Sequence, residues 1–199
     1  MNLPVMLDSA LDELYARIRP VLAVVRDGRR GAGAGILAGN GLVLTNLHVV
    51  RGRHPVEVTL DDDRTYPAKL VASDKRVDLA LLEIPVDGGA AAVLSKDSPR
   101  TGELVYAFGH PWGQRNVLTG GVLSAVTSVH GQDGEVPILR ADVQLAPGNS
   151  GGPLLNAAGE VLGLNAMIFG GDQSVAIPAG VVREFLEAAR REHVPEGVL

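Results

Sequence analysis

The stretch that decides the fold is Gly148-Asn149-Ser150-Gly151-Gly152-Pro153-Leu154, a serine with glycines on both sides. A serine hydroxyl is a weak nucleophile, so it needs a base, a carboxylate that orients the base, and donors for an oxyanion. Glycine adopts backbone conformations that other residues avoid, so N–H groups of this segment can converge on one point. The stretch therefore predicts a nucleophile, Ser150, and an oxyanion site formed by Gly148, Asn149 and Ser150. A glycine-rich turn with an incidental serine is the alternative.

Two upstream segments supply the other groups. His48 ends an apolar strand in the segment TNLHVV (45–50), and Asp78 enters one in VDLALL (77–82). A histidine beside a core more often has a structural role, but the later serine completes a set of base, orienting group and nucleophile. Asp74 competes with Asp78, yet it lies in a polar turn where solvation explains it. Asp78 is expected to be partly desolvated, and the N–H of His48 is a suitable donor for it.

These three segments, in the order His48, Asp78, Ser150, resemble the catalytic segments of chymotrypsin-fold serine proteases. They are most similar to the trypsin-like domain of the HtrA (Deg) family. Further matching segments are GAGAGIL (31–37), AFGHPWG (107–113) and SVAIP (174–178). The similarity covers roughly residues 20–190. Chance does not readily place all of these motifs in the right order.

The resemblance implies an all-β fold of two six-stranded antiparallel β-barrels, and a serine endopeptidase that forms an acyl-enzyme on Ser150. It also implies that the pocket for the residue before the scissile bond is lined by Leu145, Met167 and Ile168, although core packing explains Met167 equally well. The segment before Ser150 offers no carboxylate for a Lys or Arg side chain, since Asp142 is interpreted as structural. We therefore expect cleavage after small to medium aliphatic residues.

Hydrophobic periodicity divides the chain into five parts within one trypsin-like peptidase domain (1–199). We expect an N-terminal helix over 7–19, a first barrel over about 21–84 and a linker over 85–99. A second barrel follows over about 100–177, and a C-terminal helix over about 178–192. In the HtrA family such a helix leads to PDZ domains, whereas this chain stops, so no PDZ domain is expected. The N-terminal helix either packs on the domain or mediates oligomerisation.

Composition limits the partners. The formal charge of −5 and pI of about 5.5 argue against nucleic-acid binding. The absence of cysteine excludes disulfides and thiolate chemistry, and no metal site or cofactor is expected. No signal peptide or membrane span is visible, so we expect no membrane partner and a cytoplasmic location. The resemblance implies a protein or peptide substrate as the partner. Tyr15 is the only aromatic residue of the N-terminal segment, so a monomer is slightly favoured over the trimer typical of the family.

Other functions remain open at this point. The same fold can serve as a catalytically silent or partner-activated chaperone or peptide-binding module, or as an effector protease with one cognate substrate. In digestive proteases of this fold, an aspartate before the serine forms a salt bridge with a newly cut N-terminus and so activates the enzyme. Asn149 stands at that position and carries no charge, so this form of activation is not expected. Regulation is instead expected to come from ordering of the loops 110–116, 131–137 and 170–173. His110, in the first of these loops, is interpreted as a surface or loop residue.

Overall fold

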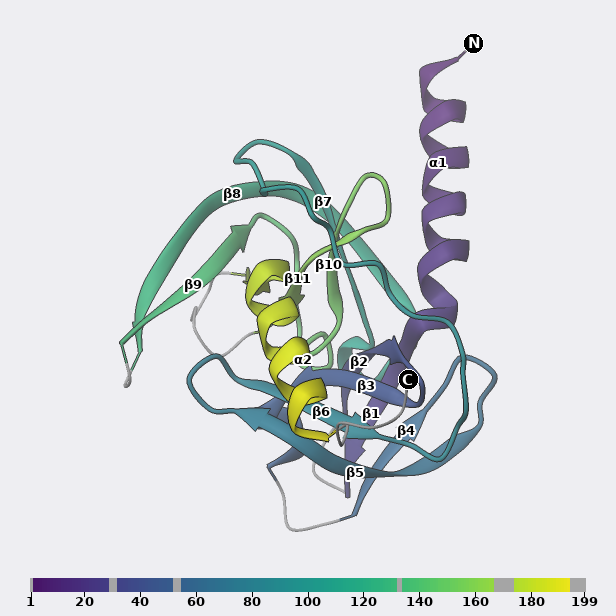
Figure 1. Cartoon of the computed structure of the whole chain (residues 1–199). Coiled ribbons are helices and arrows are strands. Elements are labelled where there is room, and N and C mark those ends of the chain that lie inside the picture. The colour runs from purple at the N-terminus through teal and green to yellow at the C-terminus, as the bar shows by residue number, and fades with distance from the viewer. Residues whose placement is uncertain (1, 29–31, 52–54, 132–133, 167–173, 194–199) are drawn as a thin grey trace.

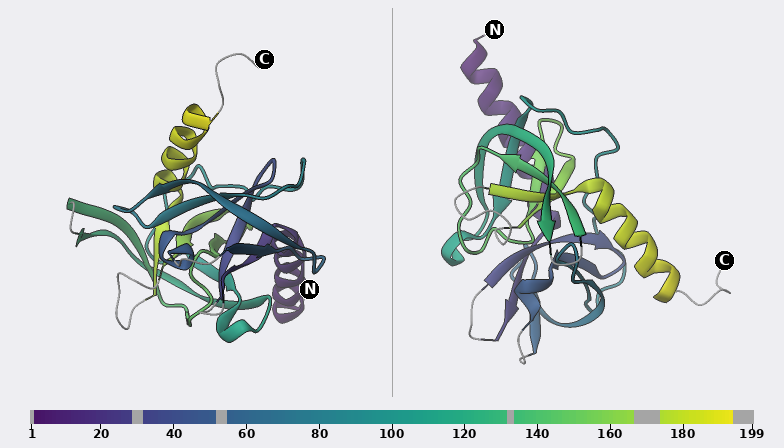
Figure 2. Two further views of the ribbon diagram at one scale, coloured as in Figure 1. Left: turned by 90° about the horizontal axis from the view of Figure 1, so that it is seen from below. Right: turned by 90° about the vertical axis from the view of Figure 1, so that its left-hand side faces the viewer.

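The computed structural model describes residues 2–28, 32–51, 55–131, 134–166 and 174–193. Within them the chain forms two closed antiparallel barrels of six strands each, with one α-helix before the first barrel and one after the second. The right-hand view of Figure 2 shows the barrels one above the other, with the first barrel below. The predicted all-β, two-barrel fold is confirmed.

The first barrel is built from the first part of the chain. Its strands close in the order β1-β2-β3-β6-β5-β4. Their bounds are β1 (Leu22–Asp27), β2 (Ala32–Gly39), β3 (Leu42–Asn46), β4 (Val56–Thr59), β5 (Thr65–Asp74) and β6 (Leu79–Glu83). Two short 3₁₀ helices, η1 (Arg19–Val21) and η2 (Leu47–Val50), precede β1 and follow β3.

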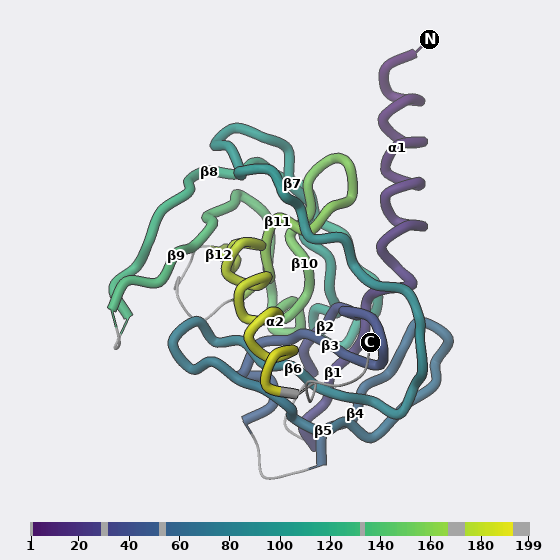
Figure 3. The backbone as a smooth tube through the Cα atoms, viewed as in Figure 1, coloured from purple at the N-terminus to yellow at the C-terminus, as the bar shows by residue number. Residues whose placement is uncertain are grey.

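The second barrel closes in the order β10-β11-β12-β9-β8-β7. Its strands are β7 (Leu104–Gly109), β8 (Val117–Gly131), β9 (Gly134–Ala141), β10 (Pro153–Asn156), β11 (Val161–Asn165) and β12 (Ser174–Pro178), and a 3₁₀ turn, η3 (Pro111–Gly113), lies between β7 and β8. Figure 3 shows the paired strands β8 and β9 reaching well beyond the rest of this barrel.

Alternation along the strands divides the buried residues among three cores. Successive side chains of a strand point to opposite faces, so Val43 packs inside the first barrel while Leu44 joins a cluster shared by both barrels. In the second barrel Leu154 packs in the barrel's own core and Leu155 joins the shared cluster. The shared cluster therefore holds together two barrels that each have a separate interior.

Two helices cover the shared cluster. Helix α1 (Leu3–Ile18) begins four residues before the predicted start at residue 7, with a proline in its first turn, where the missing N–H costs nothing. Its second half packs on the body through Leu14 and Ile18, whereas its first half stands away from the barrels (Figure 1). Helix α2 (Ala179–His193) packs on β11 and β12 and also contacts β5 and β6. It thus bridges the two barrels.

Within the described residues, no helix combines the length and the apolar character that crossing a bilayer requires.

Candidate active site

His48 and Asp78 are brought together by the pairing of β3 with β6. Asn46, the last residue of β3, lies opposite Leu79, the first residue of β6. His48 then follows in η2 and Asp78 immediately precedes β6. One carboxylate oxygen of Asp78 accepts the His48 backbone N–H at 2.9 Å, and the other lies 2.6 Å from His48 Nδ1. The buried carboxylate therefore fixes both the position and the orientation of the imidazole, which is about a quarter exposed.

The competing carboxylate, Asp74, has a local role. It accepts the backbone N–H of Arg76 at 2.8 Å and so stabilises the turn between β5 and β6. Among the described residues it makes no hydrogen bond with His48. Asp78 is thus the carboxylate that the fold presents to the histidine.

Ser150 lies in the loop between β9 and β10, at the seam between the barrels. It is 5 % exposed, and its carbonyl oxygen accepts the Ala34 N–H of β2 at 2.8 Å. The approach is close enough to require glycine at position 33, because an added Cβ would lie 2.6 Å from Val49 and 3.1 Å from the Ser150 carbonyl oxygen. Val49 directly follows His48, so the Ser150 loop and the η2 segment that carries His48 both approach the same glycine. No hydrogen bond joins Ser150 Oγ to His48 in the described part of the chain.

The backbone before Ser150 leaves two N–H groups unused. Gly148 has a φ of 111°, and a Cβ there would lie 2.2 Å from the carbonyl oxygen of His110. Neither the Gly148 nor the Ser150 N–H has an acceptor among the described residues. The Asn149 N–H does have one, the Ala146 carbonyl at 3.0 Å, so the expected contribution of Asn149 to the oxyanion site is not what the structure offers. As far as the structure describes this segment, the N–H groups of Gly148 and Ser150 are the ones left free for a substrate oxygen.

His110 lies in a loop, as the sequence suggested, but it is not at the surface. It is 1 % exposed, its Nε2 lies 3.1 Å from the Ala23 carbonyl oxygen of β1, and its Nδ1 lies 3.2 Å from the Asn116 N. The pKa of the ring is lowered to about 4, chiefly by burial and also by the positive charges of Arg115 and Arg26, while the bond to Ala23 acts in the opposite direction. At neutral pH the ring is therefore uncharged.

Asn46 is a second residue that sequence reasoning missed. Its side chain is fully buried, and its Nδ2 donates to the Asp78 carbonyl at 3.0 Å. The sequence feature that could have identified it is its position two residues before His48, at the end of an apolar strand, because a buried amide there needs a hydrogen-bond partner.

The predicted specificity pocket is described only in part. Leu145 is partly buried and packs against the core of the second barrel. Met167 and Ile168 lie outside the described residues.

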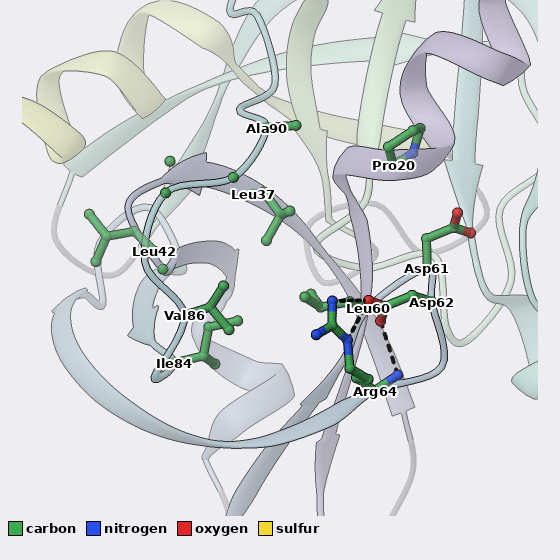
Figure 4. A pocket seen from close by; sticks show the side chains of 14 residues that line it. Pro20, Leu37, Leu42, Leu60, Asp61, Asp62, Arg64, Ile84, Val86 and Ala90 are labelled. Atoms are coloured by element: carbon green, nitrogen blue, oxygen red, sulfur yellow. Dashed lines mark hydrogen bonds and ion pairs between the residues drawn. The ribbon is translucent and has the colours of Figure 1, made fainter.

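A separate cavity of about 300 Å³ opens at one end of the first barrel (Figure 4). Apolar side chains such as Leu37, Leu42 and Val86 line it, and Asp62 and Arg64 at its edge form an ion pair with each other. Because these charges are already paired and none of the three predicted catalytic residues lines it, the cavity is not part of the candidate site.

The comparisons with known proteins agree on one family. The family model described as trypsin-like peptidase domain matches residues 33–164. The chain is 37% identical over 171 residues to a probable periplasmic serine endoprotease DegP-like of Halomonas elongata, covering 82% of this chain and 36% of that protein. It is 41% identical over 161 residues to the mitochondrial serine protease HTRA2 of Drosophila pseudoobscura, covering 77% and 38%. A crystal structure of the serine endoprotease from Yersinia pestis superposes with a TM-score of 0.80 at 29% identity, covering 91% of this chain and 66% of that one.

The names of these relatives correct one expectation. The cytoplasmic location expected from the sequence is wrong, because the bacterial relatives are named periplasmic and the Drosophila relative mitochondrial. The chain spans little more than a third of the length of the curated relatives it matches. The family model and the two-barrel fold both cover most of the chain. The chain therefore belongs to the trypsin-like peptidase domain family, with relatives of the HtrA and DegP type.

Proposed function

We propose that this chain is a serine endopeptidase that hydrolyses peptide bonds in protein substrates. The observation that carries the proposal is the buried Asp78 carboxylate on His48 Nδ1, at 2.6 Å, beside the seam that holds Ser150. An imidazole whose Nδ1–H donates to a carboxylate keeps Nε2 unprotonated, and this is the form that takes a proton from a serine.

The reaction then follows from these groups. Ser150 Oγ attacks the substrate carbonyl while His48 Nε2 takes the hydroxyl proton, and the Gly148 and Ser150 N–H groups bind the oxyanion. His48 returns the proton to the leaving amine, and water hydrolyses the acyl-enzyme. Asp78 stabilises the imidazolium that forms in between. This proposal requires no metal or cofactor.

The substrate is proposed to be an extended or unfolded segment that docks as an added strand on the second barrel. Leu145 gives the side-chain pocket one apolar wall, which favours small to medium aliphatic residues before the cleaved bond. His48, Asp78 and Ser150 all belong to one chain, so the site is complete without a second copy, and we propose a monomer. Analytical ultracentrifugation of the purified protein tests this state against the trimer.

Labelling with a fluorophosphonate serine-hydrolase probe tests the activity directly. The probe reacts only where a serine is activated and an oxyanion site is formed. We expect labelling of the unaltered protein, none in Ser150→Ala, and cleavage of fluorescein-labelled casein that is lost in the same variant. Absence of labelling together with binding of unfolded casein would instead favour the second candidate, a peptide-binding module built on the same fold.

A further inference from the structure

We infer that His110 is a positioning residue for the oxyanion site: its buried ring holds the 110–113 turn, and the backbone N–H groups of that turn set the direction of the Gly148 N–H. This inference rests on the proposed function, because it concerns the same reaction. It gives a role to His110, which the sequence alone presented as a surface or loop residue.

Two hydrogen bonds from the 110–113 turn fix the direction of the peptide groups around Gly148. The Trp112 N–H donates to the Pro147 carbonyl at 2.8 Å, and the His110 N–H donates to the Gly148 carbonyl at 3.2 Å. No cis peptide occurs among the described residues, and in a planar trans peptide the C=O and the following N–H point in opposite directions. Because the turn holds the Pro147 carbonyl, the Gly148 N–H must point away from the turn.

A flip of this peptide would undo the site. It would turn the Gly148 N–H towards the η3 turn and break the bond between Trp112 N and the Pro147 carbonyl. The Gly148 N–H would then no longer be presented to a substrate oxygen. The turn between β7 and β8 thus decides whether one of the two oxyanion donors is in place.

The turn itself has a strained backbone that needs a restraint. Trp112 has a φ of 54° and a ψ of 24°, the left-handed conformation that residues with a side chain rarely adopt. Its side chain is 78 % exposed, so packing of the indole contributes little. Asn116, at the end of the segment, is also left-handed, with a φ of 60°. Such conformations persist only where the surroundings impose them.

The His110 ring supplies that restraint from both sides. A backbone carbonyl only accepts and a backbone N–H only donates, so the ring must carry its proton on Nε2, for Ala23, and a lone pair on Nδ1, for Asn116. One neutral ring therefore ties the start of the segment to its end and both to strand β1. The Arg115 side chain also holds this segment, because it donates to the Leu60 carbonyl of the first barrel at 2.8 Å. This hydrogen bond does not involve the carbonyls of the loop that carries Gly148.

The kinetic test separates orientation from binding. The variants are His110→Ala, His110→Gln, whose side-chain amide still offers a donor and an acceptor, and His130→Ala as a matched control on the exposed face of β8. We expect His110→Ala to lower the maximal rate of fluorophosphonate labelling about 100-fold, the scale of one lost oxyanion donor, with the probe's dissociation constant changed less than about threefold. We expect His110→Gln to recover at least tenfold and His130→Ala to react like the unaltered protein.

Nuclear magnetic resonance tests the same inference without any turnover. In the unaltered protein at neutral pH, the ¹⁵N shifts of the His110 ring should show a protonated Nε2 and an unprotonated Nδ1. The Gly148 amide signal should move in His110→Gln and stay in place in His130→Ala. These signals are read even if His110→Ala does not fold.

The outcomes distinguish the two proposals. Labelling of the unaltered protein at a rate that His110→Ala leaves unchanged would overturn the positioning role and leave the peptidase proposal intact. Loss of labelling in every protein, with the predicted Gly148 shift still present, would count against the peptidase and support the positioning role. A protonated Nδ1, or an unmoved Gly148 amide, overturns the inference whatever the activity.

Discussion

Asp78 has a φ of 55°, although it carries a side chain that disfavours this conformation. Its carbonyl accepts two hydrogen bonds of 3.0 Å, one from the Asn46 side chain and one from the Leu47 N–H. These two donors hold the backbone in the orientation in which the carboxylate reaches His48. Strain at one residue is thus balanced by a buried amide on the neighbouring strand.

Replacing Asn46 tests this balance. In Asn46→Ala the Asp78 carbonyl keeps only the Leu47 donor, so we expect the rate of fluorophosphonate labelling to fall about tenfold, which corresponds to about 1.4 kcal/mol. We expect the free energy of unfolding to fall by about 1–2 kcal/mol. Asn156→Ala is the matched control, because it loses hydrogen bonds to Glu160 but contacts neither His48 nor Asp78. An unchanged labelling rate in Asn46→Ala would contradict the role of this amide.

His110 makes stability depend on pH. Its pKa in the folded protein is about 4, below the ordinary value of 6.5, so the unfolded chain binds a proton between these values and the folded chain does not. The stability contributed by the neutral ring is therefore complete above pH 6.5 and is lost as pH falls towards 4. The two values differ by an amount worth roughly 3 kcal/mol. In urea unfolding, the free energy of unfolding should fall less between pH 7 and pH 4.5 for His110→Gln than for the unaltered protein. An equal fall would contradict the lowered pKa of His110.

The residues whose roles could be predicted from the sequence differ from the others in how far apart their contacts lie along the chain. Ser150 stood out because its partners, the flanking glycines, are adjacent in the chain. The pairing of His48 with Asp78 was predicted because Asp78 enters an apolar strand, where a partly desolvated carboxylate needs a donor. His110 was misread because Ala23, its acceptor, is 87 residues away and belongs to the other barrel. No local pattern carries that contact.

At the scale of elements, the approach of strand β2 to η2 and to the Ser150 loop decides whether the site can form. Gly33 is the contact point, since it faces both Val49 and the Ser150 carbonyl. The motif GAGAG suggested a strand with small residues. The fold explains why a small residue is needed at Gly33, because η2 of the first barrel and the Ser150 loop of the second barrel meet there.

Gly33→Ala tests the approach. The added Cβ would lie 2.6 Å from Val49, so η2 or the Ser150 loop must move, and we expect about 1–3 kcal/mol of destabilisation with at least tenfold slower labelling. Gly180→Ala in α2 is the control, because no atom lies within 4 Å of its added Cβ and alanine favours a helix. Equal behaviour of the two variants in thermal unfolding and labelling would show that the contact at Gly33 is unimportant.

At the scale of the whole molecule, the shared cluster makes the two barrels dependent on each other. His48 and Asp78 belong to the first barrel, and Ser150 follows a strand of the second. The arrangement of these three residues therefore exists only while the barrels keep one relative position. Helix α2 contributes Val182, Leu186 and Ala189 to the shared cluster, and its Arg183 and Arg190 donate to the carbonyls of Ser95 and Ala38.

Leu186→Ala is expected to weaken both barrels at once. Truncating this buried side chain should lower the free energy of unfolding by about 2–5 kcal/mol, because it removes contacts and leaves a cavity in the shared cluster. Because both barrels contribute side chains to the shared cluster, we expect a single urea transition with an unchanged slope, followed by far-ultraviolet circular dichroism. Glu187→Ala, on the exposed side of the same helix, should change stability by less than about 0.5 kcal/mol. A second transition in Leu186→Ala would mean that one barrel stays folded alone, and that the position of Ser150 relative to His48 is set locally at the seam rather than by the shared cluster.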